Sequence, residues 1–336
     1  MGIDMKSFLI TGAAGSLGHT LANLMIQDND RVIGFLLPFE KEDLLDQRVI
    51  IMKGDVLDKD SLRKAFEVLG PHGTVIHCAG MISIDPKVSS RIYQVNVEGT
   101  KNVVDLSLEY HVDQLVYVSS VHAIPELKKG LIISETLTIS PDKVEGHYSK
   151  SKATATRYVM DKMALGFPAT IVYPSGIISD EDVKNAFMTQ MVKDYLAKTM
   201  KVSVKGGYDF VDVRDVALGI IAILKKKIIN EHYILSNKYY TVQTMMDILY
   251  DLTGLVKVKV SVPLSLVRLV LPLKLANDQR KNKISLYTAD SLKILNSNAI
   301  FSHEKAEKEL DYHPREIQET FDLLVKRLSN RQNPLA

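Results

Sequence analysis

Ser120, Tyr148 and Lys152 are the residues whose types and spacing could move a proton to or from a substrate oxygen. Ser120 ends the run LVYVSS, which predicts a strand that delivers a hydroxyl at its carboxyl end. Tyr148 and Lys152 are four residues apart in a segment, about 147–165, that we predict to be helical, so their side chains share one face. An ammonium beside a phenol favours the phenolate and lowers the phenol's pKa toward working pH. The sequence therefore predicts Tyr148 as a general acid or base beside Lys152, with Ser120 donating to the same substrate oxygen.

The same spacing is common and would also arise from an exposed Tyr beside a solvated Lys. The N-terminus supports the proton-transfer interpretation over this alternative. An apolar stretch at 7–11 predicts a strand, and TGAAGSLG and a helical apolar pattern follow it. This order is typical of a dinucleotide fingerprint, because glycines let the backbone approach a pyrophosphate and the helix N-terminus offers free N–H groups. An ordinary glycine-rich turn is the alternative. The predicted cofactor-binding residues here are Gly12, Ala14, Gly15, Ser16, Leu17 and Gly18.

Short apolar strands and helices continue to alternate after the glycine turn. We predict strands at 31–36, 49–53 and 74–78, helices at 60–69 and 89–110, and a strand that ends at Ser120. This alternation predicts an α/β fold with a Rossmann-type doubly wound parallel sheet, which binds ligands at the carboxyl ends of its strands. Two of these ends are predicted to line the nucleotide with Asp55, Val56, Cys78, Ala79 and Gly80. Asp55 would accept from the adenine amine, and capping of the following turn is an equal alternative.

The composition excludes several classes of protein. The 336 residues suffice for about two domains, and a hydrophobic fraction of 46% supports a large core. A net charge of +2, spread along the chain, predicts no nucleic-acid partner. Cys78 is the only cysteine, which excludes an intramolecular disulfide and a thiolate zinc cluster, and we expect no metal. The single cysteine and a start, MGIDMKSFLITG, without room for a signal peptide predict a cytoplasmic protein.

Together these motifs resemble the short-chain dehydrogenase/reductase superfamily, specifically its extended branch of NAD(P)-dependent epimerases, dehydratases and reductases. The resemblance covers essentially the whole chain, and its ordered motifs are far more specific than any one of them. The motifs are TGxxGxxG at 11–18, GDVLD at 54–58, HCAG at 77–80, NVEGTKNVVD at 96–105, YVSS at 117–120, YxxxK at 148–152, YPSGII at 173–178, FVDVRDVA at 210–217 and FSHEKAEKELDYHP at 301–314.

The resemblance implies a role for each matching position. Tyr148 would donate the proton in reduction and accept it in oxidation, while Lys152 would hold the nicotinamide ribose and lower the pKa of Tyr148. Ser120, the last serine of its strand end, would orient the substrate carbonyl. Asn96 would support the active-site helix or relay protons, and a structural Asn bonded to backbone is an equal alternative. The segment that passes near the nicotinamide would add Tyr173, Pro174, Ser175 and Ile177 to the cofactor site.

The same resemblance implies a reaction. PSGII and FVDVRDVA look more like the dihydroflavonol-reductase and beta-hydroxysteroid-dehydrogenase group than like nucleotide-sugar epimerases. This implies an NAD(P)-dependent oxidoreductase that interconverts a ketone or aldehyde and its alcohol by hydride transfer on a fairly apolar small molecule. One alternative is a nucleotide-sugar epimerase or dehydratase with tightly bound NAD. The other is a non-catalytic nucleotide-sensing regulator, against which the intact Tyr148 and Lys152 argue. The superfamily often pairs helices into dimers, which makes a homodimer one assembly to consider.

A missing acid determines the expected cofactor. In NAD-binding Rossmann folds an acid about twenty residues after the glycines binds the ribose hydroxyls. Here the strand end reads GFLLP and the next acid is Glu40. No Arg replaces it, and Lys41 is either a phosphate ligand or a solvated loop residue. We therefore expect NADP(H) in preference to NAD(H). His147 beside Tyr148 is interpreted as a wall or surface residue, with tuning of the proton transfer as the alternative.

Strict alternation weakens after Tyr173. We divide the chain into an NAD(P)-binding Rossmann domain at 1–175 and a mainly substrate-binding lobe at 176–336, with some lobe segments returning to the Rossmann sheet. Helices are predicted at 182–198 and 216–226, with an amphipathic cover of the lobe at 304–331.

The segment 256–276 is the most apolar part of the chain. It is too short for a membrane span, and Pro263, Arg268 and Pro272 interrupt it. We expect a packed helix of the lobe and no membrane contact. An apolar lid or a contact with a membrane surface is the alternative.

Overall fold

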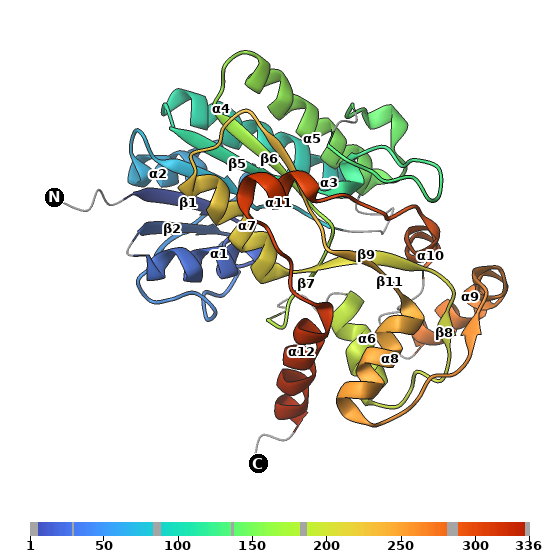
Figure 1. Cartoon of the computed structure of the whole chain (residues 1–336). Coiled ribbons are helices and arrows are strands. Elements are labelled where there is room, and N and C mark those ends of the chain that lie inside the picture. Colours follow the sequence, from blue (N-terminus) through green and yellow to red (C-terminus); the bar gives the residue numbers. More distant parts are fainter. Residues whose placement is uncertain are drawn as a thin grey trace.

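The computed structural model describes residues 6–28, 30–82, 89–135, 138–181, 187–280 and 288–332. Figure 1 shows a large sheet with helices on both of its faces, and a smaller lobe of short strands and helices on the side away from the N-terminus.

The large sheet has seven strands in the order β10-β6-β5-β4-β1-β2-β3, all paired in parallel. They are β1 (Ser7–Thr11), β2 (Arg31–Leu36), β3 (Ile50–Lys53), β4 (Thr74–His77), β5 (Gln114–Val118), β6 (Ala169–Pro174) and β10 (His232–Leu235). The predicted Rossmann-type α/β fold is confirmed. The strand order reverses between β1 and β4, and ligands of such sheets bind at the carboxyl ends of the strands beside this reversal.

Helices bury the sheet from both sides. On one face α1 (Ser16–Gln27) packs against α7 (Val213–Lys225), and the other face is covered by α2 (Lys59–Leu69), α4 (Thr100–Glu109) and α5 (His147–Ala164). Because both faces are covered, β5 and β6 are buried at every position and read as continuous apolar runs.

The segment before α4 differs from the single helix that we predicted at 89–110. It consists of α3 (Ser89–Tyr93) and a π-helical segment, Gln94–Gly99, that leads into α4. The π-helical segment contains Asn96, which is fully buried. Such wider turns recur at functional sites because they redirect individual side chains within a helix.

The C-terminal lobe is built around two small sheets. One contains β7 (Gly176–Ile178), β9 (Gly207–Asp212) and β11 (Lys238–Thr241), and the other pairs β8 (Ser203–Val204) with β12 (Ser261–Val262). Its helices are α6 (Phe187–Leu196), α8 (Val242–Thr253), α9 (Leu264–Arg280), α10 (Ala289–Asn296) and α12 (Ile317–Gln332). Of the helix predicted at 182–198, residues 182–186 lie outside the described residues. β10 and α11 (Glu304–Leu310) pack on the large sheet instead, although they come from the second half of the sequence.

The packed helix predicted at 256–276 is only partly correct. The segment forms β12 and α9, and α9 packs inward with Leu264, Val267 and Leu271. Its other side exposes a row of leucines and a valine to solvent. The helix is apolar around most of its circumference, so the lobe can bury only one of its faces.

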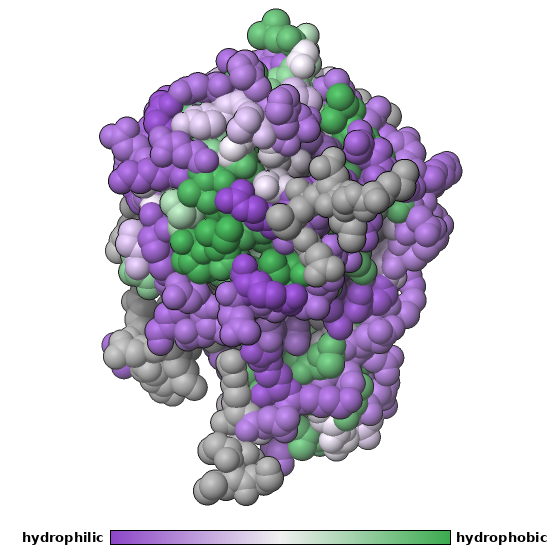
Figure 2. All heavy atoms as spheres, turned by 90° about the vertical axis from the view of Figure 1, so that its left-hand side faces the viewer, coloured by the Kyte–Doolittle hydropathy of each residue, from purple (hydrophilic) through white to green (hydrophobic). Residues whose placement is uncertain are grey.

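Figure 2 views the molecule from the side on which the chain enters β1. This face is mainly hydrophilic, with a hydrophobic area near its centre and smaller hydrophobic areas elsewhere. Within the described part of the chain, no helix has the length and apolar character needed to cross a membrane. The strands of the large sheet run from this side toward the lobe, so their carboxyl ends meet the lobe (Figure 1).

Candidate active site

The glycine loop forms a cradle that only glycine can build. Gly12 has a φ of +71°, and a Cβ on it would lie 2.8 Å from the Cα of Ala79. A Cβ on Gly18 would lie 2.2 Å from the carbonyl oxygen of Gly12. α1 begins directly after Gly15 with no side-chain cap, which leaves its first N–H groups and positive dipole end available to an anion. With Ala14, Ser16 and Leu17 in the same turn, the cradle fits a dinucleotide pyrophosphate.

The end of β4 connects this loop to the predicted proton-transfer residues. The N–H of Ala79 donates to the Thr11 hydroxyl at 3.3 Å. A Cβ on Gly80 would lie 3.5 Å from the Nζ of Lys152. Burial raises the pKa of the neighbouring Cys78 thiol to about 12, so Cys78 stays protonated at neutral pH.

Asp55 makes the capping contact that was the alternative to adenine binding. Its Oδ1 accepts from the N–H of Leu57 at 3.0 Å, and its Oδ2 pairs with the Nη2 of Arg91 at 3.1 Å. The next residue, Val56, is buried against Gly99. The adenine contact stays a prediction.

Ser120 and Tyr148 are brought together by β5 and α5. Ser120 follows β5, and its hydroxyl accepts from the N–H of His122 at 3.2 Å in the short turn Val121–Ala123. The Ser120 hydroxyl also lies near the Tyr148 phenol and acts to lower its pKa. α5 starts immediately before Tyr148, after Gly146 with a φ of +89°, so the phenol projects from the first turn of a helix that is otherwise packed on the sheet. Tyr148 itself is partly exposed, as a group that must meet a substrate needs to be.

Lys152 is buried, with 5% of its surface exposed. Its Nζ donates to the carbonyl oxygen of Val118 at 2.9 Å and lies 5.2 Å from the ring centre of Tyr117. Burial lowers the pKa of Lys152 to about 8. The expected lowering of the pKa of Tyr148 by Lys152 is not found: burial raises the pKa of Tyr148 to about 12, and the nearby Ser120 side chain opposes this rise. The reason is position, because the ammonium is held against the end of β5.

Asn96 supports α5 from the π-helical segment. Its Nδ2 donates to the Ser151 hydroxyl at 3.0 Å and to the carbonyl oxygen of Met81 at 3.0 Å, while its Oδ1 accepts from the N–H of Met81 at 2.7 Å. Ser151 in turn donates to the carbonyl oxygen of Tyr148 at 2.7 Å. The structure thus contains the supporting and backbone-bonding contacts considered for Asn96. His147 lies on the surface, as its interpretation as a surface imidazole predicted.

The predicted residues after β6 occupy different surroundings. Tyr173 is buried, and its hydroxyl lies 3.1 Å from the Nδ1 of His232 on the neighbouring strand. Pro174 ends β6, Ser175 is buried after it, and Ile177 lies in β7 against the core shared by α1 and α7. The segment therefore leads from the sheet into the lobe.

An aromatic wall beside Tyr148 was not predicted. We define it as His122, Tyr208, Phe210 and Phe301. The His122 ring centre lies 5.8 Å from that of Tyr148, edge to face, and its Nε2 lies 3.1 Å from the Tyr208 hydroxyl. Tyr208 contacts the two phenylalanines at ring distances of 5.8 and 6.2 Å.

This aromatic wall is uncharged at neutral pH. Burial lowers the pKa of His122 to about 4 and raises the pKa of Tyr208 well above its usual value. Its members come from three segments far apart in the sequence, so no local pattern joins them. His122 lies two residues after Ser120, and Phe210 and Phe301 begin two of the family motifs, but none of these signals indicated that the residues meet.

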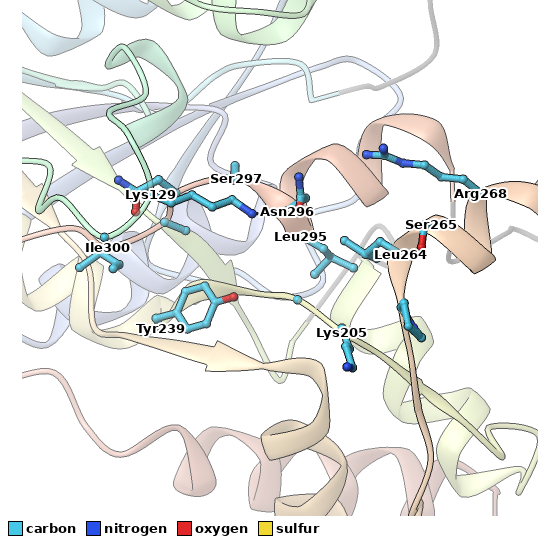
Figure 3. A pocket seen from close by; sticks show the side chains of 15 residues that line it. Lys129, Lys205, Tyr239, Leu264, Ser265, Arg268, Leu295, Asn296, Ser297 and Ile300 are labelled. Atoms are coloured by element: carbon cyan, nitrogen blue, oxygen red, sulfur yellow. Dashed lines mark hydrogen bonds between the residues drawn. The ribbon is translucent and has the colours of Figure 1, made fainter.

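A separate cavity of about 560 Å³ lies in the C-terminal lobe (Figure 3). Its lining includes Lys129, Lys205 and Arg268 together with Tyr239 and Leu295. None of the residues predicted for catalysis or cofactor binding lines it. The cavity is therefore distinct from the place where Ser120 and Tyr148 meet.

Comparisons with known proteins agree with this geometry. Residues 8–236 match the NAD dependent epimerase/dehydratase family. A similar relative is the sterol demethylase protein B of Methylococcus capsulatus, 26% identical over 316 residues that cover 93% of this chain and 95% of the relative. Another is the human 3 beta-hydroxysteroid dehydrogenase type 7, 29% identical over 224 residues that cover 61% and 60% of the two chains.

Among solved structures, the crystal structure of gox2253 is similar over 98% of both chains, with a TM-score of 0.83 and 26% identity. The resemblance stated from the motifs is thereby confirmed. The structural similarity covers 98% of the chain, and the family match covers residues 8–236. The protein is an NAD(P)-dependent enzyme that belongs to the NAD dependent epimerase/dehydratase family.

Proposed function

We propose that this protein interconverts a ketone or aldehyde and its alcohol, by hydride exchange with a nicotinamide cofactor, on a largely apolar small molecule. The single observation that carries this proposal is the uncharged aromatic wall beside Tyr148. An apolar substrate gains free energy when aromatic rings remove it from water. Two relatives named for sterol and steroid chemistry support the same substrate class.

A nucleotide-sugar substrate would need different groups from those that the aromatic wall supplies. A diphosphate that is held near the reacting carbon needs cationic or N–H donors around it. The aromatic wall offers two phenylalanines, a neutral imidazole and a phenol, and burial makes a charge there costly. Those groups favour a neutral substrate.

The proposed reaction gives a separate role to each of Tyr148, Ser120 and Lys152. When bound, the nicotinamide supplies or receives the hydride. In reduction the Tyr148 phenol, neutral because its pKa is raised to about 12, donates its proton to the substrate oxygen as the carbonyl becomes an alcohol. The Ser120 hydroxyl donates a hydrogen bond to the same oxygen. The Lys152 ammonium, protonated below about pH 8, would hold the hydroxyls of the nicotinamide ribose when the cofactor is bound.

We also propose NAD(H) as the preferred cofactor, in place of the NADP(H) expected from the sequence. The side chain of Glu40 folds back, and its Oε2 accepts from the N–H of Leu37, the residue after β2, at 3.0 Å. This brings a carboxylate to the strand end at which NAD-binding folds hold the ribose hydroxyls. A ribose phosphate at the same place would be repelled.

The Glu40→Gln variant tests this preference. We expect the ratio of the NADPH to the NADH dissociation constant to fall by about tenfold, which corresponds to about 1.4 kcal/mol. Glu42→Gln is the matched control, because Glu42 is exposed and pairs with Lys53 instead. Fluorescence titration of both reduced cofactors measures the ratio, and equal ratios in wild type and Glu40→Gln would contradict the proposal.

The reaction is tested by measuring NADH consumption with a panel of apolar ketones and aldehydes. We expect turnover with at least one sterol-sized or aromatic ketone. Mass spectrometry of nucleotide released from the denatured protein addresses the alternative. Near-stoichiometric NAD, together with interconversion of nucleotide sugars without net NADH consumption, would replace the proposed reaction by epimerisation.

A further inference from the structure

One face of α9 carries an apolar stripe that the lobe leaves open. We define the α9 stripe as Leu266, Leu269, Val270 and Leu273, whose exposed fractions are between 53% and 76%. These positions follow the i, i+3, i+4, i+7 spacing of a single helix face. Side chains on the opposite face pack into the lobe, so α9 is fixed with the α9 stripe outward. A contiguous exposed apolar surface of this kind usually marks a contact with another phase or molecule.

The small sheet beside α9 extends this surface. Val202 and Val260 are both exposed, and they precede the paired strands β8 and β12. The N–H of Ser203 donates to the carbonyl oxygen of Val260 at 2.9 Å, which holds the two segments side by side. Apolar side chains therefore continue from α9 onto its neighbouring strands.

Positive charges predominate along the segments that carry this surface, and Asp278 is the single acid in the sequence of α9. The segments 198–208 and 254–277 contain no Asp and no Glu, whereas the chain as a whole is nearly balanced at +2. Their cations are Lys198, Lys201, Lys205, Lys257, Lys259, Arg268 and Lys274. Lys205 and Arg268 line the same cavity from the two segments, together with Lys129 (Figure 3). The segments that carry the α9 stripe and its neighbouring strands are therefore basic.

We propose that α9 lies on the surface of a membrane that contains anionic phospholipid. The α9 stripe enters the boundary between headgroups and acyl chains, and the surrounding cations meet lipid phosphates. Apolar residues on one helix face with Lys and Arg beside them are typical of helices that lie in this interface. α9 has 17 residues and lies parallel to such a surface without crossing it.

Charge complementarity selects the membrane over a second copy of this chain. In a two-fold dimer through the α9 stripe, each basic surface would face its own copy. Seven cations on each side, against the single acid Asp278 of α9, would then repel one another. An anionic bilayer can contact both the α9 stripe and the cations, because it offers an apolar layer beneath a negatively charged surface.

The full-length protein tests this proposal in a vesicle sedimentation assay that needs no turnover. We expect binding to vesicles of equimolar phosphatidylcholine and phosphatidylglycerol, weaker binding to phosphatidylcholine alone, and release at high salt. The double variant Leu269→Ser with Leu273→Ser should lose more than about tenfold in partitioning to the anionic vesicles. Leu165→Ser is the matched control, because Leu165 is 84% exposed on the other part of the molecule and its loss should change nothing.

Three results would overturn the proposal. These are equal partitioning of the wild type and the double variant, equal binding to neutral and anionic vesicles, and a dimer by light scattering that the double variant abolishes while neither protein binds vesicles. The replaced leucines are exposed, so we expect an unchanged melting temperature and unchanged NADH affinity in the variant. These two measurements separate a loss of membrane contact from a loss of fold.

Discussion

Replacing Tyr148 by Phe removes one oxygen atom from the candidate site and leaves the ring in place. The ring keeps its edge contact with His122, and the phenol is partly exposed, so the packing of α5 does not change. A single hydrogen bond contributes about 0.5–1.5 kcal/mol to stability, so removing the hydroxyl leaves the protein folded.

The effect on catalysis should be much larger. A positioned general acid contributes about 10²- to 10⁴-fold to a rate, which equals about 3–5 kcal/mol in the activation free energy. We expect kcat to fall by this factor in the reduction of a ketone. The affinity for NADH should stay within about threefold, because binding rests on the glycine cradle and on Lys152.

Tyr158→Phe is the matched control on the same helix. Its hydroxyl donates to the Oδ1 of Asp105 at 2.5 Å, away from Ser120. Steady-state kinetics and NADH fluorescence titration on both variants measure the difference. The reasoning is refuted if Tyr148→Phe turns over at the wild-type rate, or if both tyrosine variants lose activity equally.

Three further expectations concern the same site. Oxidation of the alcohol needs the Tyr148 phenolate, so kcat/KM for oxidation should rise about tenfold per pH unit. Above about pH 8 Lys152 loses its proton and with it the charged contact to the nicotinamide ribose, so kcat/KM for oxidation should level and kcat/KM for reduction should fall; a pH profile in both directions checks this. Gly18→Ala should weaken NADH binding by more than about tenfold in a titration and lower the melting temperature, because its Cβ would lie 2.2 Å from a carbonyl oxygen of the loop. Tyr208→Leu should change KM for the ketone and the preference among ketones, while the NADH dissociation constant stays constant. If the variant loses NADH binding as well, the aromatic wall serves only the fold.

Much of the fold follows from local sequence, because strands and helices of a doubly wound sheet are each specified by a short pattern. The apolar run before Gly12, the glycine spacing and the helical pattern after it define β1, its turn and α1 without reference to distant residues. The four-residue spacing of Tyr148 and Lys152 is likewise a property of one helix.

Local sequence could not predict the π-helical segment or the face of α9 that is exposed. The wider turn at Asn96 is stabilised by bonds to Met81 and Ser151, which come from other segments of the chain. α9 is apolar on nearly all sides, so its sequence could not show which face the lobe would leave exposed.

The sequence by itself determined the elements, the cradle for the dinucleotide and the residues able to transfer a proton, because each of these depends on neighbours within a few positions. Only the tertiary structure decided the environment of those residues. It buries Lys152 against Val118 and not beside the Tyr148 phenol, and it folds Glu40 back to the end of β2. It also assembles the aromatic wall from His122, Tyr208 and Phe301. Burial, charge and substrate contact depend on which distant segments meet, and that is a property of the packed chain.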